Sequence, residues 1–272
     1  MRFPMKRLWG ALLVTAVLAG SVPAQTIVYS NNPAPGDLFT NPTTVNLGQP
    51  VGTSGWYYNN VRNNGAVGIR TDLPRSGNGS VWFRGTQGPT GNSSKADIEF
   101  WSSKPLGTLN DLTHLSYEWY RKGGSSYTAS NWLHPALRIW ISDGTNSGYL
   151  VFERAYNPTT NPVPTDQWIY DEINDSTILW STGTLPSATN TFQPLSWWKT
   201  TAGLGSFKVY GISAGIGSGW GTFEGAVDNI SYRFGNGPLV TTNFEVVPEP
   251  ATMALFGLGL AAVGGLVRRK KA

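Results

Sequence analysis

The chain has 272 residues, a formal net charge of +4, two histidines and no cysteine. The lack of cysteine excludes disulfide scaffolds, cysteine-ligated zinc and thiol catalysis. Of the 20 Lys and Arg residues, three precede residue 25 and four follow residue 246. Only one of the 16 Asp and Glu residues lies in these two end segments. The segment between them therefore carries 13 cations and 15 acids. This small negative balance argues against a nucleic-acid partner.

The first 24 residues predict a cleaved signal peptide. A basic start precedes an apolar run at Leu8–Gly20, and small residues follow at positions 22–24. We expect the mature chain to begin at Gln25; the alternative is an uncleaved N-terminal anchor.

Short segments that alternate apolar and polar residues recur along the exported part, separated by Gly, Pro and Asn. No segment of ten or more residues there keeps a 3.6-residue period, which disfavours helices. The pattern predicts an all-β ectodomain at residues 25–245, a β-sandwich of jelly-roll type. We expect strands at Ile27–Tyr29, Ala66–Leu73, Gly79–Gly85, Ala96–Trp101, Leu115–Lys122, Ala136–Ser142, Tyr149–Tyr156, Trp168–Ile173, Ile178–Ser181, Lys208–Gly215 and Ala226–Phe234, with a helical turn or short strand at Leu195–Thr200.

A tetrapeptide in the last of these strands carries a resemblance. Val227-Asp228-Asn229-Ile230 resembles the closing strand of concanavalin-like and carbohydrate-binding β-sandwiches. Asp228, with Asp37 or Asp143 nearby in space, is a candidate for a structural calcium site, because calcium prefers oxygen ligands from loops. We expect no other cofactor.

Catalytic motifs are weak. Gly211-Ile212-Ser213-Ala214-Gly215 matches the nucleophile elbow of α/β-hydrolases, but its alternation predicts a strand and we interpret the match as accidental. His114 and His134 lie at strand edges and are interpreted as ordinary sandwich residues.

Paired carboxylates could serve glycoside hydrolysis. The Glu-x-Asp-x-x-Glu pattern of concanavalin-like glycosidases is absent, and the nearest stretch, residues 171–175, lacks the final acid at the right spacing. Glu118 and Glu153 sit in mid-strand, where they could face each other. We expect no enzymatic activity and keep a glycan-active enzyme as the alternative.

A ligand-binding face is suggested by the side of four strands opposite the apolar residues. If these strands share a sheet, aromatic rings alternate with Arg and Glu on one face, which suits the C–H faces and hydroxyls of sugars. The alternative is an ordinary set of cross-strand pairs. The candidate residues are Trp82, Arg84, Glu99, Trp101, Glu118, Tyr120, Arg138 and Trp140.

The last residues, 246–272, are organised as a sorting signal. Pro248-Glu249-Pro250 precedes an uncharged apolar run, Ala251–Val267, and then the cluster Arg268, Arg269, Lys270 and Lys271. The run would give a helix of roughly 26 Å, at the short end of a membrane span, with the basic cluster on the cytoplasmic side. This order resembles the PEP-CTERM sorting tail of Gram-negative bacteria, a tail also catalogued as an ice-binding-protein C-terminus.

The PEP-CTERM resemblance implies an exported protein that is anchored transiently in the inner membrane, cleaved by an exosortase-type enzyme, and delivered to the cell surface or extracellular matrix. We expect a non-enzymatic biofilm-matrix protein that binds extracellular polysaccharide. The alternatives are a glycan-active enzyme on the same sandwich and a purely structural surface protein.

Overall fold

The computed structural model describes residues 24–86, 94–125, 132–157, 163–186, 191–218 and 220–249. The expected signal peptide lies outside these residues except for Ala24, and the expected membrane helix and basic cluster lie outside them altogether. Within the described ranges, no helix has the length and hydropathy needed to cross a membrane.

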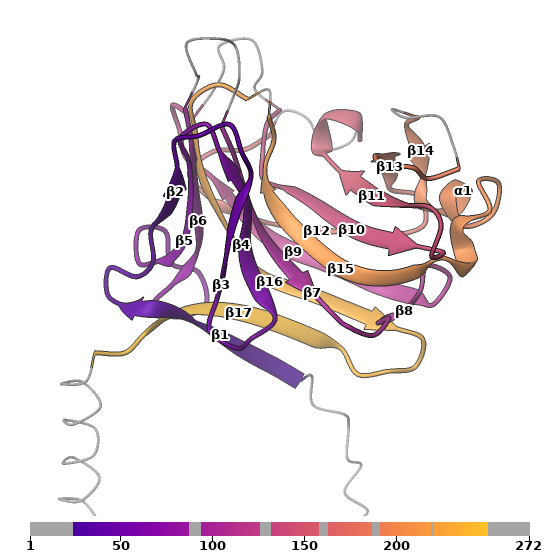
Figure 1. Cartoon of the computed structure of the whole chain (residues 1–272), viewed down its shortest axis with the longest axis horizontal. Coiled ribbons are helices and arrows are strands. Elements are labelled where there is room, and N and C mark those ends of the chain that lie inside the picture. The colour runs from indigo at the N-terminus through magenta and orange to yellow at the C-terminus, as the bar shows by residue number, and fades with distance from the viewer. Residues whose placement is uncertain are drawn as a thin grey trace, which may run out of the picture.

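The described strands form two sheets, which face each other as a β-sandwich of jelly-roll type (Figure 1). Sheet A has eight strands and contains β1 (Ala24–Pro33), β17 (Val240–Val247), β16 (Phe223–Phe234), β6 (Ser80–Gly85), β5 (Gly65–Arg70) and β2 (Phe39–Asn41), with β9 (Leu112–Arg121) between β16 and β12 (Trp168–Glu172). Sheet B has nine strands and runs β14 (Gln193–Pro194), β13 (Ile178–Ser181), β11 (Ser147–Phe152), β10 (Ala136–Ser142), β15 (Lys208–Ile216), β7 (Lys95–Trp101), β4 (Trp56–Arg62) and β3 (Leu47–Pro50), with β8 (Gly107–Thr108) beside β15. The all-β prediction is confirmed.

Alternation along each strand builds the core between the sheets. On β10, Leu137, Ile139 and Ile141 are each no more than 1% exposed and belong to one cluster of buried side chains. Because successive side chains point to opposite faces of a sheet, Arg138 and Trp140 lie on the other side of β10. Sheet B therefore has an apolar face toward sheet A and a second face, which we call the open face.

Helical structure is confined to short turns in the described part of the chain. Of the helical turn and the short strand considered for Leu195–Thr200, the structure has the helical turn, α1 (Leu195–Lys199), and the 3-10 turns η1 (Arg154–Tyr156) and η3 (Leu204–Ser206) join strands. Trp198 of α1 is fully buried, and its Nε1 donates to the carbonyl oxygens of Leu179 at 3.2 Å and Gln193 at 3.0 Å. The helix thereby fixes the β13–β14 end of sheet B.

The first and last described strands pair with each other. Strand β1 runs parallel to β17, with Ala24 opposite Val240 and Pro33 opposite Val247. Val246 is 1% exposed, and the Val247 N–H donates to Ser30 Oγ at 3.0 Å. The expected ectodomain boundary at residue 245 thus falls inside a strand, because pairing with β1 continues to Val247.

Candidate functional site

The eight residues predicted to share one face are divided between the two sheets. Those of β6 and β9, namely Trp82, Arg84, Glu118 and Tyr120, lie in sheet A, whereas Glu99 and Trp101 of β7 and Arg138 and Trp140 of β10 lie in sheet B. The expectation of a single sheet is wrong, because period-two alternation sets the side to which a residue points but says nothing about which strands pair.

On sheet A, the Trp82 ring is covered by neighbouring polar side chains. The guanidinium carbons of Arg70 and Arg84 lie 5.4 and 5.6 Å from the Trp82 ring, and the Trp82 Nε1 donates to Glu224 Oε1 at 3.2 Å. Trp82 is only 5% exposed, so its ring is covered by these partners rather than open to a ligand.

A row of aromatic rings crosses the open face of sheet B. The register places Trp101 of β7 opposite Gly211 of β15, Gly211 opposite Trp140 of β10, and Trp140 opposite Tyr149 of β11. The Trp101 and Trp140 centroids are 5.7 Å apart, and those of Trp140 and Tyr149 are 4.8 Å apart, both edge to face. Since glycine has no side chain, the two tryptophans meet above β15. We call Trp101, Trp140 and Tyr149 the aromatic row; each ring is half-buried.

Glu99 lies beneath this row and is 1% exposed. Its Oε1 accepts hydrogen bonds from Tyr149 Oη at 2.9 Å and Asn60 Nδ2 at 3.0 Å. Its Oε2 accepts from Trp101 Nε1 at 3.0 Å and Asn59 Nδ2 at 2.5 Å. Four donors on one carboxylate fix two rings of the aromatic row and satisfy the buried charge.

A buried ionic triad of Lys95, Asp97 and Arg138 adjoins the row. Lys95 Nζ lies 2.7 Å from Asp97 Oδ2, and Arg138 Nη1 lies 2.8 Å from Asp97 Oδ1. Burial alone would raise the pKa of Asp97, but the opposing charges of Arg138 and Lys95 outweigh it and lower that pKa below its usual value. Asp97 is therefore ionised at neutral pH.

Small residues on β15 make room for this triad. Arg138 starts on β10 and reaches Asp97 on β7, so its side chain crosses the intervening β15 at Ser213 and Gly215. A Cβ added at Gly215 would lie 2.3 Å from Asp97 Oδ1 and 2.4 Å from the Ala96 carbonyl oxygen. Glycine is therefore required at this position for the ion pair to form above the strand.

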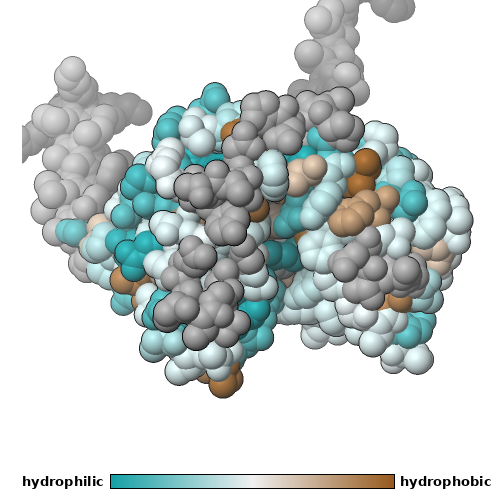
Figure 2. All heavy atoms as spheres, turned by 90° about the horizontal axis from the view of Figure 1, so that it is seen from above, coloured by the Kyte–Doolittle hydropathy of each residue, from teal (hydrophilic) through white to brown (hydrophobic). Residues whose placement is uncertain are grey.

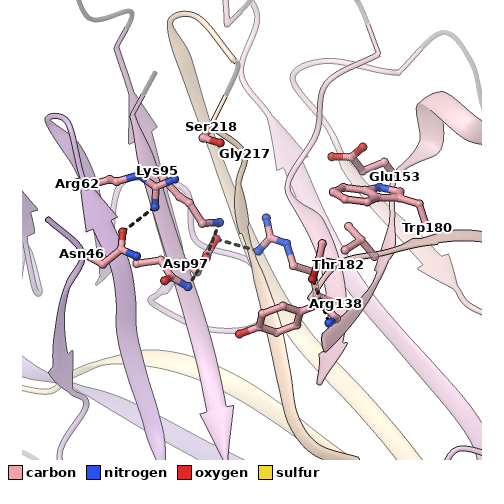
Figure 3. Close-up of a pocket in the computed structure, with 13 residues that line it drawn as sticks. Asn46, Arg62, Lys95, Asp97, Arg138, Glu153, Trp180, Thr182, Gly217 and Ser218 are labelled. Atoms are coloured by element: carbon pink, nitrogen blue, oxygen red, sulfur yellow. Dashed lines mark hydrogen bonds and ion pairs between the residues drawn. The ribbon is translucent and has the colours of Figure 1, made fainter. Parts of the chain in front are cut away.

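The triad opens into a pocket of about 340 Å³ on the open face, which we call the sheet-B pocket. Seen from above, the molecule is hollowed between two lobes (Figure 2). Arg62 and Asn46 stand on one side of the pocket, and Glu153 and Trp180 stand on the other (Figure 3). Tyr149 lines both the pocket and the aromatic row, so the two form one continuous site.

Glu153 has an unusual acidity for a pocket residue. Its burial raises the pKa of the carboxyl above the usual value, and the positive charge of Arg138 only partly offsets this. The pocket therefore holds two acids of different character, an ionised Asp97 and a Glu153 that retains its proton to higher pH.

The sequence did not single out Lys95, Asp97, Tyr149 or Trp180, or the part that Glu153 has in the pocket. The sequence did carry one signal of the space above β15. Gly211, Ser213 and Gly215 place three small residues on one face of a strand whose other face is apolar. Such a pattern indicates that side chains from neighbouring strands cross above it.

The remaining catalytic candidates have ordinary places in the fold. Ser213 lies within β15 and is 1% exposed, so the resemblance to a nucleophile elbow is accidental as expected. Burial lowers the pKa of His134 to about 4, and its Nε2 accepts the Arg154 backbone N–H at 2.7 Å. His114 lies 3.0 Å from Glu172.

The carboxylates proposed for calcium have separate partners. Asp228 accepts the backbone N–H groups of Phe244 at 3.0 Å and Ser76 at 3.2 Å. Asp37 bonds to Tyr58 Oη at 2.6 Å, and Asp143 accepts the N–H of Thr145 at 2.8 Å in the β10–β11 turn. No group of three or more acidic or histidine side chains suited to a metal occurs in the described ranges.

Comparison with known proteins identifies the end of the chain. Residues 246–270 match the PEP-CTERM protein-sorting motif. The expected sorting tail is thus confirmed, and with it an exported protein whose motif implies surface sorting and processing by an exosortase-type enzyme. No curated protein matches the chain.

Among solved structures, the chain is similar to β-sandwich proteins at low identity. A structure described as one of carbohydrate-binding modules from the β-sandwich superfamily shares 14% identity at a TM-score of 0.33, covering 75% of this chain; the chain spans 62% of that protein's length. A xylanase mutant shares 11% identity at a TM-score of 0.41, and the match covers 77% of this chain and 91% of the xylanase chain. An endoglucanase from Rhodothermus marinus shares 14% identity at a TM-score of 0.34, and the match covers 73% of this chain and 100% of the endoglucanase chain.

Proposed function

We propose that this exported protein is a non-enzymatic surface or matrix protein that binds extracellular polysaccharide on the open face of sheet B. In this proposal the chain is held transiently in the inner membrane by residues 251–267 before sorting. The observation that carries the proposal is the continuity of the aromatic row with the sheet-B pocket through Tyr149.

Each part of this site suits a different part of a sugar. Half-buried rings offer apolar surface on which the C–H face of a pyranose stacks, and their mutual contacts hold them in place before the ligand arrives. The pocket volume, about 340 Å³, lies at the lower end of the range for small-ligand sites and fits a single sugar unit. Charged groups along its wall provide fixed hydrogen bonds for hydroxyls.

The state of the carboxylates favours binding over catalysis. A glycosidase needs one carboxylic acid and one carboxylate that act on the scissile bond from positions flanking it. Here Asp97 is bonded to two cations and Glu99 to four donors. Neither is free to act as a nucleophile or to activate a water molecule.

The test is the affinity of the purified chain for a panel of polysaccharides, measured by the retardation of the protein in gels that contain each polymer. Trp140→Ala should weaken binding by about 1–3 kcal/mol, which is between fivefold and 150-fold. Trp168→Ala is the matched control, because this half-buried ring lies on β12 of sheet A. Equal retardation of both variants by every polymer would contradict the proposal.

One observation favours the alternative of a glycan-active enzyme. The raised pKa of Glu153 is a property of general acids in glycoside hydrolysis. If the site is catalytic, the chain should release reducing ends from a polymer that it binds, and Glu153→Gln should abolish this release while leaving the affinity within about twofold. Binding without release supports the non-enzymatic function.

A further inference from the structure

Basic residues outnumber acidic residues in the lining of the sheet-B pocket. Its wall carries three cations, Arg62, Lys95 and Arg138, and two acids, Asp97 and Glu153. We propose that the pocket selects an anionic sugar unit, one that bears a carboxylate or a sulfate group. This inference rests on the proposed polysaccharide function and assigns its ligand class.

The triad lies beside a second buried carboxylate, that of Glu99. Lys95 and Arg138 share the single carboxylate of Asp97, one on each oxygen. Asn60 Nδ2 also donates to Asp97 Oδ2 at 3.0 Å, so the lone pairs of this carboxylate are well occupied. Burial and the charge of Arg138 lower the pKa of Lys95, and the Glu99 carboxylate acts on Lys95 and Arg138 together with Asp97. The buried groups therefore balance, and the positive charge that remains at the pocket is that of Arg62 at its rim.

Arg138 has donors that a stronger acceptor can recruit. Besides Asp97, its contacts are with Ser213 Oγ at 3.3 Å and the Gly215 carbonyl oxygen at 3.5 Å, both near the limit of a hydrogen bond. A guanidinium presents five donors in a planar fork that matches a carboxylate or sulfate. An anionic sugar substituent would form shorter, charge-assisted bonds than these neutral contacts do.

The rim and the opposite wall strengthen this selection. Arg62 Nη1 donates to the neutral Asn46 Oδ1 at 2.6 Å, and among the described residues it has no ion-pair partner. Burial raises the pKa of Glu153 on the opposite wall, so a negative charge there is less favourable than on an exposed glutamate. A neutral sugar over the rim would desolvate Arg62 without pairing its charge, which is unfavourable.

The experiment compares polymers that differ only in charge. Polygalacturonate, alginate and hyaluronate are each paired with the same polymer after its carboxyl groups have been reduced to alcohols. Dextran sulfate paired with dextran is the sulfate arm. Binding of the full-length chain in mild detergent is measured at 50 and 300 mM salt, which distinguishes charge-dependent from neutral recognition.

We expect at least one charged polymer to bind tenfold or more tightly than its neutral partner. Arg62→Gln and Arg138→Gln should each reduce that affinity about tenfold, the effect of one charge-assisted hydrogen bond. Arg62 stands at the rim, so its variant remains informative if Arg138→Gln unfolds the chain. Arg84→Gln, an exposed arginine on β6 of sheet A, is the matched control and should bind as the wild type does.

The outcomes separate the two proposals. Equal affinity for reduced and charged polymers overturns the anionic selection and keeps polysaccharide binding. The selection also fails if Arg84→Gln weakens binding as much as the pocket variants, because that result means nonspecific attraction of polyanions. If no polymer binds, the proposed function falls together with this inference.

Discussion

Replacing Glu99 with glutamine tests the carboxylate that holds the aromatic row. The change preserves shape but puts an NH₂ group where one carboxylate oxygen accepted two hydrogen bonds. In the less damaging orientation the amide nitrogen faces Tyr149 and Asn60, because the Tyr149 hydroxyl can turn to accept a bond. One hydrogen of the Asn60 amide then loses its acceptor, while the bond of this amide to Asp97 remains, and an N–H without a partner costs about 1–3 kcal/mol.

The remaining bonds also weaken, because a neutral amide oxygen replaces a charged one. Hydrogen bonds to charged groups contribute about 1.5–3 kcal/mol, against about 0.5–1.5 kcal/mol for neutral ones. Taken together, we expect Glu99→Gln to lower the free energy of unfolding by about 3 kcal/mol, near the upper range of single substitutions.

Equilibrium urea unfolding followed by tryptophan fluorescence measures this loss. With a slope near 3 kcal/mol per molar urea, the midpoint should fall by about 1 M at unchanged slope. Glu172→Gln is the control, since this exposed glutamate of β12 contacts His114 and Tyr170 at the surface. A Glu99→Gln midpoint within about 0.2 M of the control would show that the four donors do not depend on the charge of this carboxylate.

Three further predictions concern acidity, the domain boundary and processing. Burial raises the pKa of Asp228 to about 7, although three backbone N–H groups oppose the shift, so the folded state binds a proton that the unfolded state has lost. The contribution of Asp228 to stability should therefore be complete below about pH 4 and decline by up to about 4 kcal/mol as the pH rises to 7. The free energy of unfolding measured against pH should then differ in shape between the wild type and Asp228→Asn, and identical profiles would exclude this. A fragment of residues 25–247 should fold alone, and its melting temperature should not depend on reductant, since the chain has no cysteine. A fragment of residues 25–245 should melt at a lower temperature, because it lacks Val246 and the Val247–Ser30 bond. Equal melting temperatures of the two fragments would count against the pairing of β1 with the end of β17. Mass spectrometry of surface material should find chains that begin at Gln25 and end near Val247, and detection of full-length chains alone in the inner membrane would argue against sorting.

The fold class could be read from the sequence because alternation is a local property. Leu137, Ile139 and Ile141 predict a buried face without knowledge of any neighbour, and the structure confirms it. The same reasoning placed Glu99, Trp101, Arg138 and Trp140 correctly on the side away from the core.

Strand pairing could not be read in this way, because it depends on contacts distant in sequence. β15 separates β7 from β10, yet it lies more than 65 residues beyond the end of β10 in the chain. The prediction of one aromatic face therefore joined halves of two different sheets. The triad was missed for a related reason. Lys95 and Asp97 read as ordinary alternating polar residues until Arg138 is brought across a strand of small residues.

The parallel pairing of β1 with β17 has a consequence for the order of events during export. The signal peptide that the sequence predicts would export the chain N-terminus first, and β1 would then emerge 216 residues ahead of its partner, from Ala24 to Val240. Contacts so distant in sequence form late, because a long loop must close before they can form. β17 ends at Val247, directly before Pro248-Glu249-Pro250. In that order of export, the last strand completes the sheet only when the residues next to the sorting motif have also emerged, and a chain that stalls earlier presents neither a finished domain nor the sorting motif. Completion of the fold and readiness for sorting are in this way linked in time.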